Sequence, residues 1–166
     1  HETKSMYFAS FDSNGICLKK GLVPYGDIKL SPAATVLNYG QGVFEGTKAY
    51  ETSKNHVVFF RLEENARRFN NSCSRLCIPE IPNEMFVNSI KETVLDNLEY
   101  MPKKEQGSLY IRPLAFGSGP DLGVKPSSSY IFLVYVTPVG SYFQSGLKSL
   151  NVLVTDSYHR VATKSI

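Results

Sequence analysis

The order of apolar and polar residues predicts a mixture of strands and helices. The segment from Met6 to Phe11 is mainly apolar and rich in aromatic residues, Asp12-Ser13-Asn14-Gly15 has the composition of a tight turn, and Ile16-Cys17-Leu18 is apolar again. Two apolar runs around an Asn-Gly pair are typical of a β-hairpin. A second hairpin is expected from the β-rich run Val43 to Tyr50 and the short apolar run Val57 to Arg61.

Two helices are expected in the middle of the chain. From Leu62 onward apolar residues recur at spacings of three and four, which indicates an amphipathic helix. Its buried face would consist of Leu62, Ala66, Phe69, Cys73, Leu76 and Cys77. Pro79 and Pro82 would end this helix, and Asn83 would cap a second apolar-periodic segment that runs to Met101-Pro102.

The last third of the chain is rich in β-forming residues. Three runs, 108–116, 129–136 and 150–154, read as strands, and the Gly-, Pro- and Ser-rich segments 117–128 and 140–148 read as loops. Hairpins, then helices, then strands predict an α+β fold in which two helices pack on an antiparallel sheet.

Composition and charge exclude several classes of protein. With 166 residues, 42% hydrophobic residues and a net charge of +3, the chain can bury a core, and its basic residues are not clustered as in a nucleic-acid binder. No apolar run is long enough to cross a bilayer, and no secretion signal is visible, so a soluble intracellular protein without a nucleic-acid or membrane partner is expected. The three cysteines lack metal-ligand spacing, so no metal site is expected, and Cys73 and Cys77 read as core positions.

A few polar and aromatic residues are candidates for chemistry. Tyr110 and Arg112 project from one face of a predicted strand, where a guanidinium beside a phenol could bind a carboxylate. The alternative is a strand face that is exposed to solvent. Arg67 or Arg68 could reach a phosphate, or both could be exposed. Tyr39 and Phe44 stand beside glycines, which suits either a pocket wall or the core.

Several segments together resemble a known enzyme family. They are Leu37-Asn38-Tyr39-Gly40-Gln41-Gly42-Val43-Phe44-Glu45-Gly46-Thr47-Lys48-Ala49-Tyr50, the helix entry 61–69, Tyr110-Ile111-Arg112-Pro113, 117–124 and 138–143. In this order they are similar to the branched-chain-amino-acid aminotransferases, most closely to the eukaryotic, plant-like members. The resemblance covers nearly the whole chain.

The resemblance implies a pyridoxal 5'-phosphate enzyme of fold type IV. It predicts an N-terminal α+β domain at residues 1–137, an interdomain linker at 138–148, and the first strands of an incomplete C-terminal cofactor domain at 149–166. Members of the family transfer the amino group of leucine, isoleucine or valine to 2-oxoglutarate and act as homodimers. The resemblance does not distinguish cytoplasm, plastid and mitochondrion.

The resemblance also assigns roles to individual residues. Arg68 would bind the cofactor phosphate, Tyr39, Phe44, Tyr110 and Tyr142 would form the wall around the substrate side chain, Arg112 would help to bind the distal carboxylate of glutamate, and Val124 would enter the neighbouring subunit's pocket. Lys164, in Lys-Ser-Ile, would be the catalytic lysine that forms the Schiff base.

The end of the chain departs from the family pattern. The Gly-rich stretch that precedes the lysine in similar proteins is missing, and the chain stops at Ile166. We therefore expect a piece of a longer protein, with two functional hypotheses. The first is an aminotransferase that is active only when its other half is supplied, and the second is a non-catalytic module that dimerises with a full-length relative.

Overall fold

The computed structural model describes residues 2–104, 106–140, 149 and 151–157. The strands are β1 (Ser5–Asp12), β2 (Cys17–Pro24), β3 (Gly42–Phe44), β4 (Thr47–Glu51), β5 (Val57–Phe59), β6 (Ser108–Gly117) and β7 (Ser129–Val139). The helices are α1 (Thr35–Tyr39), α2 (Leu62–Arg75) and α3 (Asn83–Asp96), followed by a short 3₁₀ turn, η1 (Leu98–Tyr100).

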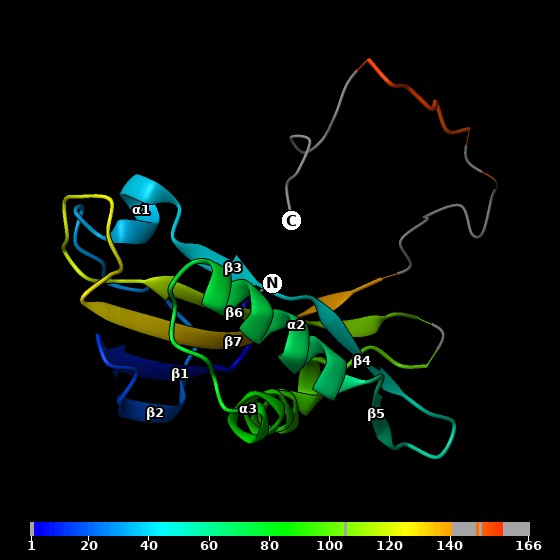
Figure 1. The fold of residues 1–166 in the computed structure, drawn as a ribbon. Helices are drawn as coiled ribbons and strands as arrows, with labels where there is room; N and C mark the ends of the chain where they lie inside the picture. The colour runs from blue at the N-terminus through cyan, green and yellow to red at the C-terminus, as the bar shows by residue number, and fades with distance from the viewer. Residues whose placement is uncertain (1, 105, 141–148, 150, 158–166) are drawn as a thin grey trace.

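All strands belong to one antiparallel sheet. Its order is β2-β1-β7-β6-β4-β5, and β3 pairs with β6 next to β4 (Figure 1). The long strands β6 and β7 lie at its centre and pair along their whole length, from Ser108↔Val139 to Gly117↔Tyr130. The α+β fold with two helices against an antiparallel sheet is therefore confirmed.

The two faces of the sheet are covered differently. Helices α2 and α3 cover one face, which we call the helix face (Figure 1), where Phe69, Phe86 and Phe132 form a cluster of rings. On the opposite face, here called the open face, the connection between β2 and α1 covers one part through Ile28 and Leu30, and the rest is not covered by the described residues. Because neighbouring residues of a strand point to opposite faces, each position of β6 and β7 can be assigned to one of the two.

The predicted hairpins form, but the second one is interrupted. The Asn-Gly turn joins β1 to β2, with the Gly15 N–H donating to the Asp12 carbonyl at 3.1 Å. The expected run Val43 to Tyr50 is split at Glu45 and Gly46 into β3 and β4, which both pair with β6. The Glu45 N–H donates to the Pro113 carbonyl at 3.0 Å, so the chain stays beside β6. The side chain of Glu45 no longer follows the alternation of side chains between the two faces of the sheet.

The first helix ends earlier than expected, which changes the environment of Cys77. Helix α2 stops at Arg75, and Cys77 takes a left-handed conformation with φ of 53°, so its side chain is exposed rather than on the buried face. Cys73 is buried as expected, and desolvation raises the pKa of its thiol to about 12. The prediction for Cys77 was wrong because a periodic pattern does not show where the backbone leaves the helix.

Two further expectations need correction. Asn83 is the first residue of α3 and makes no capping bond to it; its side-chain oxygen instead accepts a bond from Asn70 Nδ2 at 3.2 Å. The expected strand at 150–154 is not seen in residues 151–157, which form no strand. Val152, Leu153 and Val154 are 78%, 88% and 90% exposed there, and none of the described strands pairs with them.

Candidate functional site

Three of the predicted residues meet on the part of the open face that the described residues leave uncovered. We call Phe44, Tyr110 and Arg112 the Arg112 cluster. The Arg112 guanidinium lies 4.3 Å from the centre of the Phe44 ring and 5.3 Å from that of Tyr110, and its Nη2 donates to the Tyr110 hydroxyl at 2.8 Å. A cation over aromatic rings is stabilised by about 0.5–2 kcal/mol. The cluster therefore holds a positive charge in a fixed place.

The Arg112 cluster keeps unused hydrogen-bonding capacity. Arg112 Nε is buried and has no hydrogen-bond partner among the described residues. The Tyr110 oxygen already accepts a bond from Arg112, so its own proton can be donated to another oxygen. Phe44 remains 63% exposed. An arginine and a phenol with free donors beside an exposed ring are suited to bind the carboxylate of a molecule with an apolar side chain.

The lack of a side chain at Gly46 leaves room for the Tyr110 hydroxyl. A Cβ atom at position 46 would lie 3.2 Å from Tyr110 Cζ and would overlap the hydroxyl oxygen. The φ of Gly46 is not in the left-handed region, so glycine is needed here for space and not for its backbone freedom. The sequence showed glycines beside aromatic rings but not which ring approaches Gly46.

Arg68 lies on α2 and is held by a carboxylate from the break between β3 and β4. Its Nε and Nη2 donate to Glu45 Oε1 and Oε2, both at 2.8 Å. Asn65 Nδ2 and the Gly46 N–H also donate to Glu45 Oε2, at 3.0 and 3.3 Å. The Glu45 side chain is largely buried and that of Arg68 is more than half exposed, so the pair fixes the guanidinium with its remaining N–H groups toward solvent.

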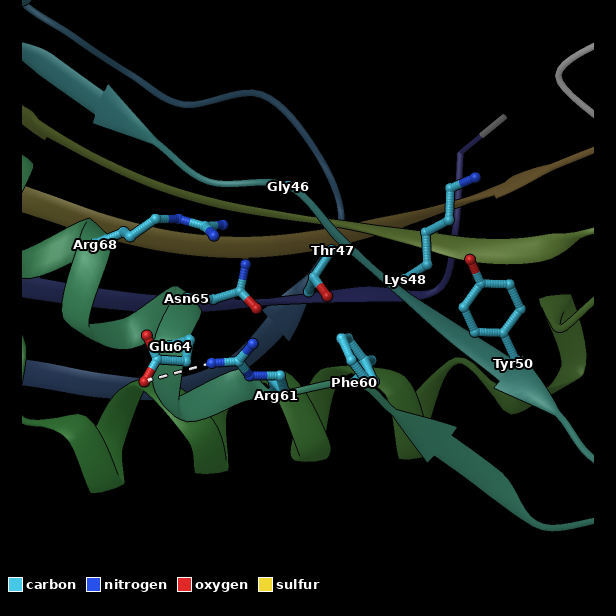
Figure 2. Close-up of a pocket in the computed structure, with 9 residues that line it drawn as sticks. All are labelled: Gly46, Thr47, Lys48, Tyr50, Phe60, Arg61, Glu64, Asn65 and Arg68. Carbon is cyan, nitrogen blue, oxygen red and sulfur yellow. Dashed lines mark ion pairs between the residues drawn. The ribbon is translucent and has the colours of Figure 1, made fainter.

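A groove of about 370 Å³ runs between β4 and α2, and we call it the β4–α2 groove (Figure 2). It is lined by Gly46, Thr47, Lys48, Tyr50, Phe60, Arg61, Glu64, Asn65 and Arg68. In Figure 2 the Arg68 guanidinium points along the groove toward Gly46. Arg68 can therefore bind an anion that enters this groove, as a phosphate-binding residue must.

The ionisation of Glu45 should couple stability to pH. Burial of Glu45 raises its pKa, but the bonds from Arg68 and Asn65 outweigh burial, so the pKa lies below its ordinary value of 4.5. A carboxyl group with a lowered folded-state pKa contributes stability that is present above its unfolded pKa and is lost as the pH falls through the folded value. The Glu45–Arg68 contribution should therefore disappear in acid, below about pH 4.5.

Urea unfolding at pH 6 and at pH 3 tests this coupling. The wild type should lose more stability between these pH values than Glu45→Gln, because the variant has no carboxylate to protonate. Arg68→Met should reduce the loss in the same way, and the double variant should add nothing further. An equal loss in wild type and Glu45→Gln would show that Glu45 carries no such dependence.

Tyr39 and Val124 meet in a second groove. This groove, of about 330 Å³, is lined by residues of α1, of the end of α2 and of the 117–128 loop, including Tyr39, Cys77 and Val124. The Tyr39 hydroxyl accepts a bond from the Gly123 N–H at 2.7 Å, and Val124 is 93% exposed beside it. Both residues lie apart from the Arg112 cluster within this chain.

The predicted site residues thus divide into three sets. Phe44, Tyr110 and Arg112 form one cluster, Arg68 faces the β4–α2 groove, and Tyr39 lies with Val124. Lys164 and Tyr142 lie outside the described residues. Sequence reasoning assigned no role to Glu45, although its place between Phe44 and a glycine was visible, because its contact with Arg68 is made across 23 positions of the chain.

Neither a membrane span nor a metal cluster is found in the described part of the chain. Among residues 2–104, 106–140, 149 and 151–157, no helix is long and apolar enough to cross a membrane. The same residues contain no group of three or more His, Cys, Asp and Glu side chains that could hold a metal ion.

The sequence is similar to curated plant proteins over most of its length. It is 45% identical over 158 residues to "Branched-chain-amino-acid aminotransferase 5, chloroplastic" of Arabidopsis thaliana, a match that covers 95% of this chain and 38% of the relative. It is 46% identical over 138 residues to "Branched-chain amino acid aminotransferase 1, mitochondrial" of Humulus lupulus, with 83% and 35% covered. No family model matches the chain.

The fold is similar to solved structures of the same kind. The branched-chain aminotransferase of the archaeon Thermoproteus uzoniensis, solved with norvaline, aligns with a TM-score of 0.62 and 26% identity, over 84% of this chain and 43% of that one. The Escherichia coli branched-chain amino acid aminotransferase aligns with a TM-score of 0.61 and 25% identity, over 84% and 41%. In sequence and in fold, the chain is similar to the N-terminal part of branched-chain-amino-acid aminotransferases.

The expected similarity to branched-chain-amino-acid aminotransferases, including plant members, and the expected fold are therefore confirmed. The chain spans about two fifths of the length of these aminotransferases. The activity of a complete aminotransferase is therefore assigned to this chain only as a proposal.

Proposed function

We propose that this chain supplies the substrate-facing part of a branched-chain-amino-acid aminotransferase, which transfers amino groups from leucine, isoleucine or valine to 2-oxoglutarate. The Arg112 cluster carries this proposal. Its guanidinium and phenol can bind a substrate carboxylate while the exposed Phe44 ring contacts an apolar side chain. Activity of the whole enzyme would also require the part that binds the cofactor. The proposal includes an N-terminal domain at residues 1–137, an interdomain linker at 138–148 and the start of the cofactor domain at 149–166.

The residues toward the β4–α2 groove fit the phosphate of pyridoxal 5'-phosphate. Glu45 uses one edge of the Arg68 guanidinium, and the other N–H groups remain available for an anion. When bound, this cofactor would carry the substrate amino group and act as an electron sink for the electron pair that remains at Cα after its proton is removed. In this proposal Arg68 binds the cofactor phosphate, and Arg112 and Tyr110 orient the substrate carboxylate. Lys164 moves the proton that leaves the substrate Cα.

The second candidate is a module that pairs with another subunit, by analogy with a dimeric aminotransferase. The exposed side chains of Leu122 and Val124 favour it, because the bond between Gly123 and Tyr39 fixes their loop and leaves both apolar groups uncovered. Co-expression with a full-length plant aminotransferase tests this candidate. Mixed dimers that disappear in Val124→Asp would support it, and exclusive homodimers of the relative would contradict it.

Ligand binding tests the first proposal directly. Arg112→Met should weaken binding of 4-methyl-2-oxopentanoate at least about tenfold, since a charge-assisted hydrogen bond is worth about 1.5–3 kcal/mol and each 1.4 kcal/mol changes affinity tenfold. Arg75→Met is the matched control, because this exposed arginine at the end of α2 has no ion pair among the described residues. Equal affinities of wild type and Arg112→Met, measured by calorimetric or NMR titration, would contradict the proposal.

A further inference from the structure

A further groove lies on the helix face of the sheet, between the β1–β2 hairpin and α3, and we call it the β2–α3 groove. Helix α3 packs against β1 and β2, beside which it lies in Figure 1. The groove has a volume of about 590 Å³. Residues of the hairpin line one wall, and residues of α3 and of the segment before it line the other. The sheet therefore separates this groove from the Arg112 cluster, which lies on the open face.

The α3 wall of the β2–α3 groove is acidic. Glu84, Asn88 and Glu92 follow one another at intervals of four residues, so they lie on one face of the helix. Glu80 lines the groove just before the helix begins. All three glutamates are exposed, and none of them has an ion pair with another described residue. At a rise of about 1.5 Å per residue, Glu84 and Glu92 are about 12 Å apart along the helix axis.

Tyr7 of β1 brings an unused hydroxyl group to the same groove. Its side chain is only 5% exposed, and its ring packs edge-on against Phe132. The hydroxyl makes no hydrogen bond to any of the residues that the structure describes. Burial raises the pKa of Tyr7, and the nearby Glu92 and Cys17 raise it further, so the phenol is protonated and faces these two groove residues. A largely buried hydroxyl needs a partner, and a molecule bound in the groove can supply it.

Apolar side chains lie between the polar groups of the β2–α3 groove. Phe11 belongs to the buried core beneath it, and Met85 packs against that core. Methylene chains bind to such surfaces while their charged ends stay in water, as lysine side chains do. Lys20 adds one positive charge from the hairpin, so three glutamates face one lysine. A groove with an excess of negative charge concentrates cations.

We propose that the β2–α3 groove binds a linear aliphatic polyamine. Glu84 and Glu92 bind ammonium groups at two points along the chain, and the Tyr7 hydroxyl accepts a hydrogen bond from an ammonium. The methylene segments lie on Phe11 and Met85. Charges spread along a flexible chain match carboxylates spread along a helix face better than one compact cation does. The site goes beyond the proposed function and does not depend on it, since it uses none of the residues of the Arg112 cluster.

Calorimetric titration of the chain with spermidine tests the proposal. Glu84→Gln should weaken spermidine binding about threefold, and the double variant with Glu92→Gln about tenfold. Tyr7→Phe should weaken it as well, because the variant keeps the ring and loses the hydroxyl. Lys20→Met should strengthen it about threefold, because a competing positive charge is removed.

Glu63→Gln is the matched control for Glu84→Gln. Glu63 is the second residue of α2 as Glu84 is of α3, and it is exposed but does not line the β2–α3 groove. Both variants remove the same charge from the first turn of a helix. Glu63→Gln should therefore bind spermidine as the wild type does.

Two other cations separate a polyamine site from a general attraction of positive charge. 1-Butylamine, with a single charge, and Mg²⁺, which is compact and gives up its water reluctantly, should each bind at least about tenfold more weakly than spermidine. The proposal is overturned if the wild type does not bind spermidine, if Glu84→Gln and Glu63→Gln lose affinity equally, or if Mg²⁺ binds as tightly. None of these outcomes changes the binding of 2-oxo acids, so the proposed function is tested separately.

Discussion

Phe132→Ala is expected to lower the free energy of unfolding by about 3–5 kcal/mol, the range for removing a buried phenylalanine. Phe132 lies in the central strand β7, is fully buried, and contacts the rings of Tyr7, Phe69 and Phe86 with centroids 6.3, 5.7 and 6.2 Å away. These rings join the sheet to both α2 and α3. Their loss would therefore weaken the attachment of both helices and leave a cavity that the β-sheet cannot close.

Chemical denaturation of three variants checks this expectation. Phe60→Ala is the matched control, since Phe60 is 74% exposed and its removal should change stability by less than about 0.5 kcal/mol. Phe132→Leu removes less volume and should show a smaller loss in the same direction, which keeps the prediction testable if the alanine variant does not fold. A Phe132→Ala variant as stable as Phe60→Ala would mean that the core is not centred on this ring.

Gly46→Ala is expected to weaken binding of 2-oxo acids about tenfold with little change in the fold. The new methyl group would occupy the place of the Tyr110 hydroxyl, which would have to move and would lose its bond to Arg112. A displaced hydroxyl and a released guanidinium remove at least one charge-assisted hydrogen bond to the ligand. Because the atoms nearest to the new methyl group belong to the Tyr110 side chain and not to the backbone, the tyrosine ring can shift while the backbone remains in place.

A control and a double variant make this prediction specific. Gly26→Ala adds the same methyl group at a position with no atom within 4 Å, so it should bind as the wild type does. Tyr110→Phe should bind about as weakly as Gly46→Ala, and combining the two should cost no more than either alone, because both remove the same hydroxyl contact. Additive losses in the double variant would show that Gly46 acts by some other route.

Local sequence patterns predicted the elements and one half of the site. The Asn-Gly pair located the first hairpin, and two-residue alternation was enough to place Tyr110 and Arg112 on one face of a strand. Both inferences use neighbours in the chain. The Schiff-base lysine and the tyrosine of the 138–143 segment were expected from family resemblance, and Lys164 and Tyr142 remain predictions.

Long-range contacts could not be predicted in this way. Phe44 reaches Arg112 because β3 pairs with β6 in the register Phe44↔Leu114, and Glu45 reaches Arg68 because the chain breaks between β3 and β4. Neither the register nor the break follows from propensity, since both depend on how distant strands pair. The exposure of Cys77 depended on the end of α2 at Arg75, and helix ends are poorly defined by apolar periodicity alone.

The most direct measurement is an amide-resolved NMR titration of the chain with 4-methyl-2-oxopentanoate. Our account predicts that the largest shift changes occur at Phe44, Gly46, Tyr110 and Arg112, where β3, β4 and β6 meet on the open face, and that they vanish in Arg112→Met. No shift changes, or changes centred on the opposite side of the sheet around Cys17 and Glu84, would contradict a carboxylate site at the Arg112 cluster.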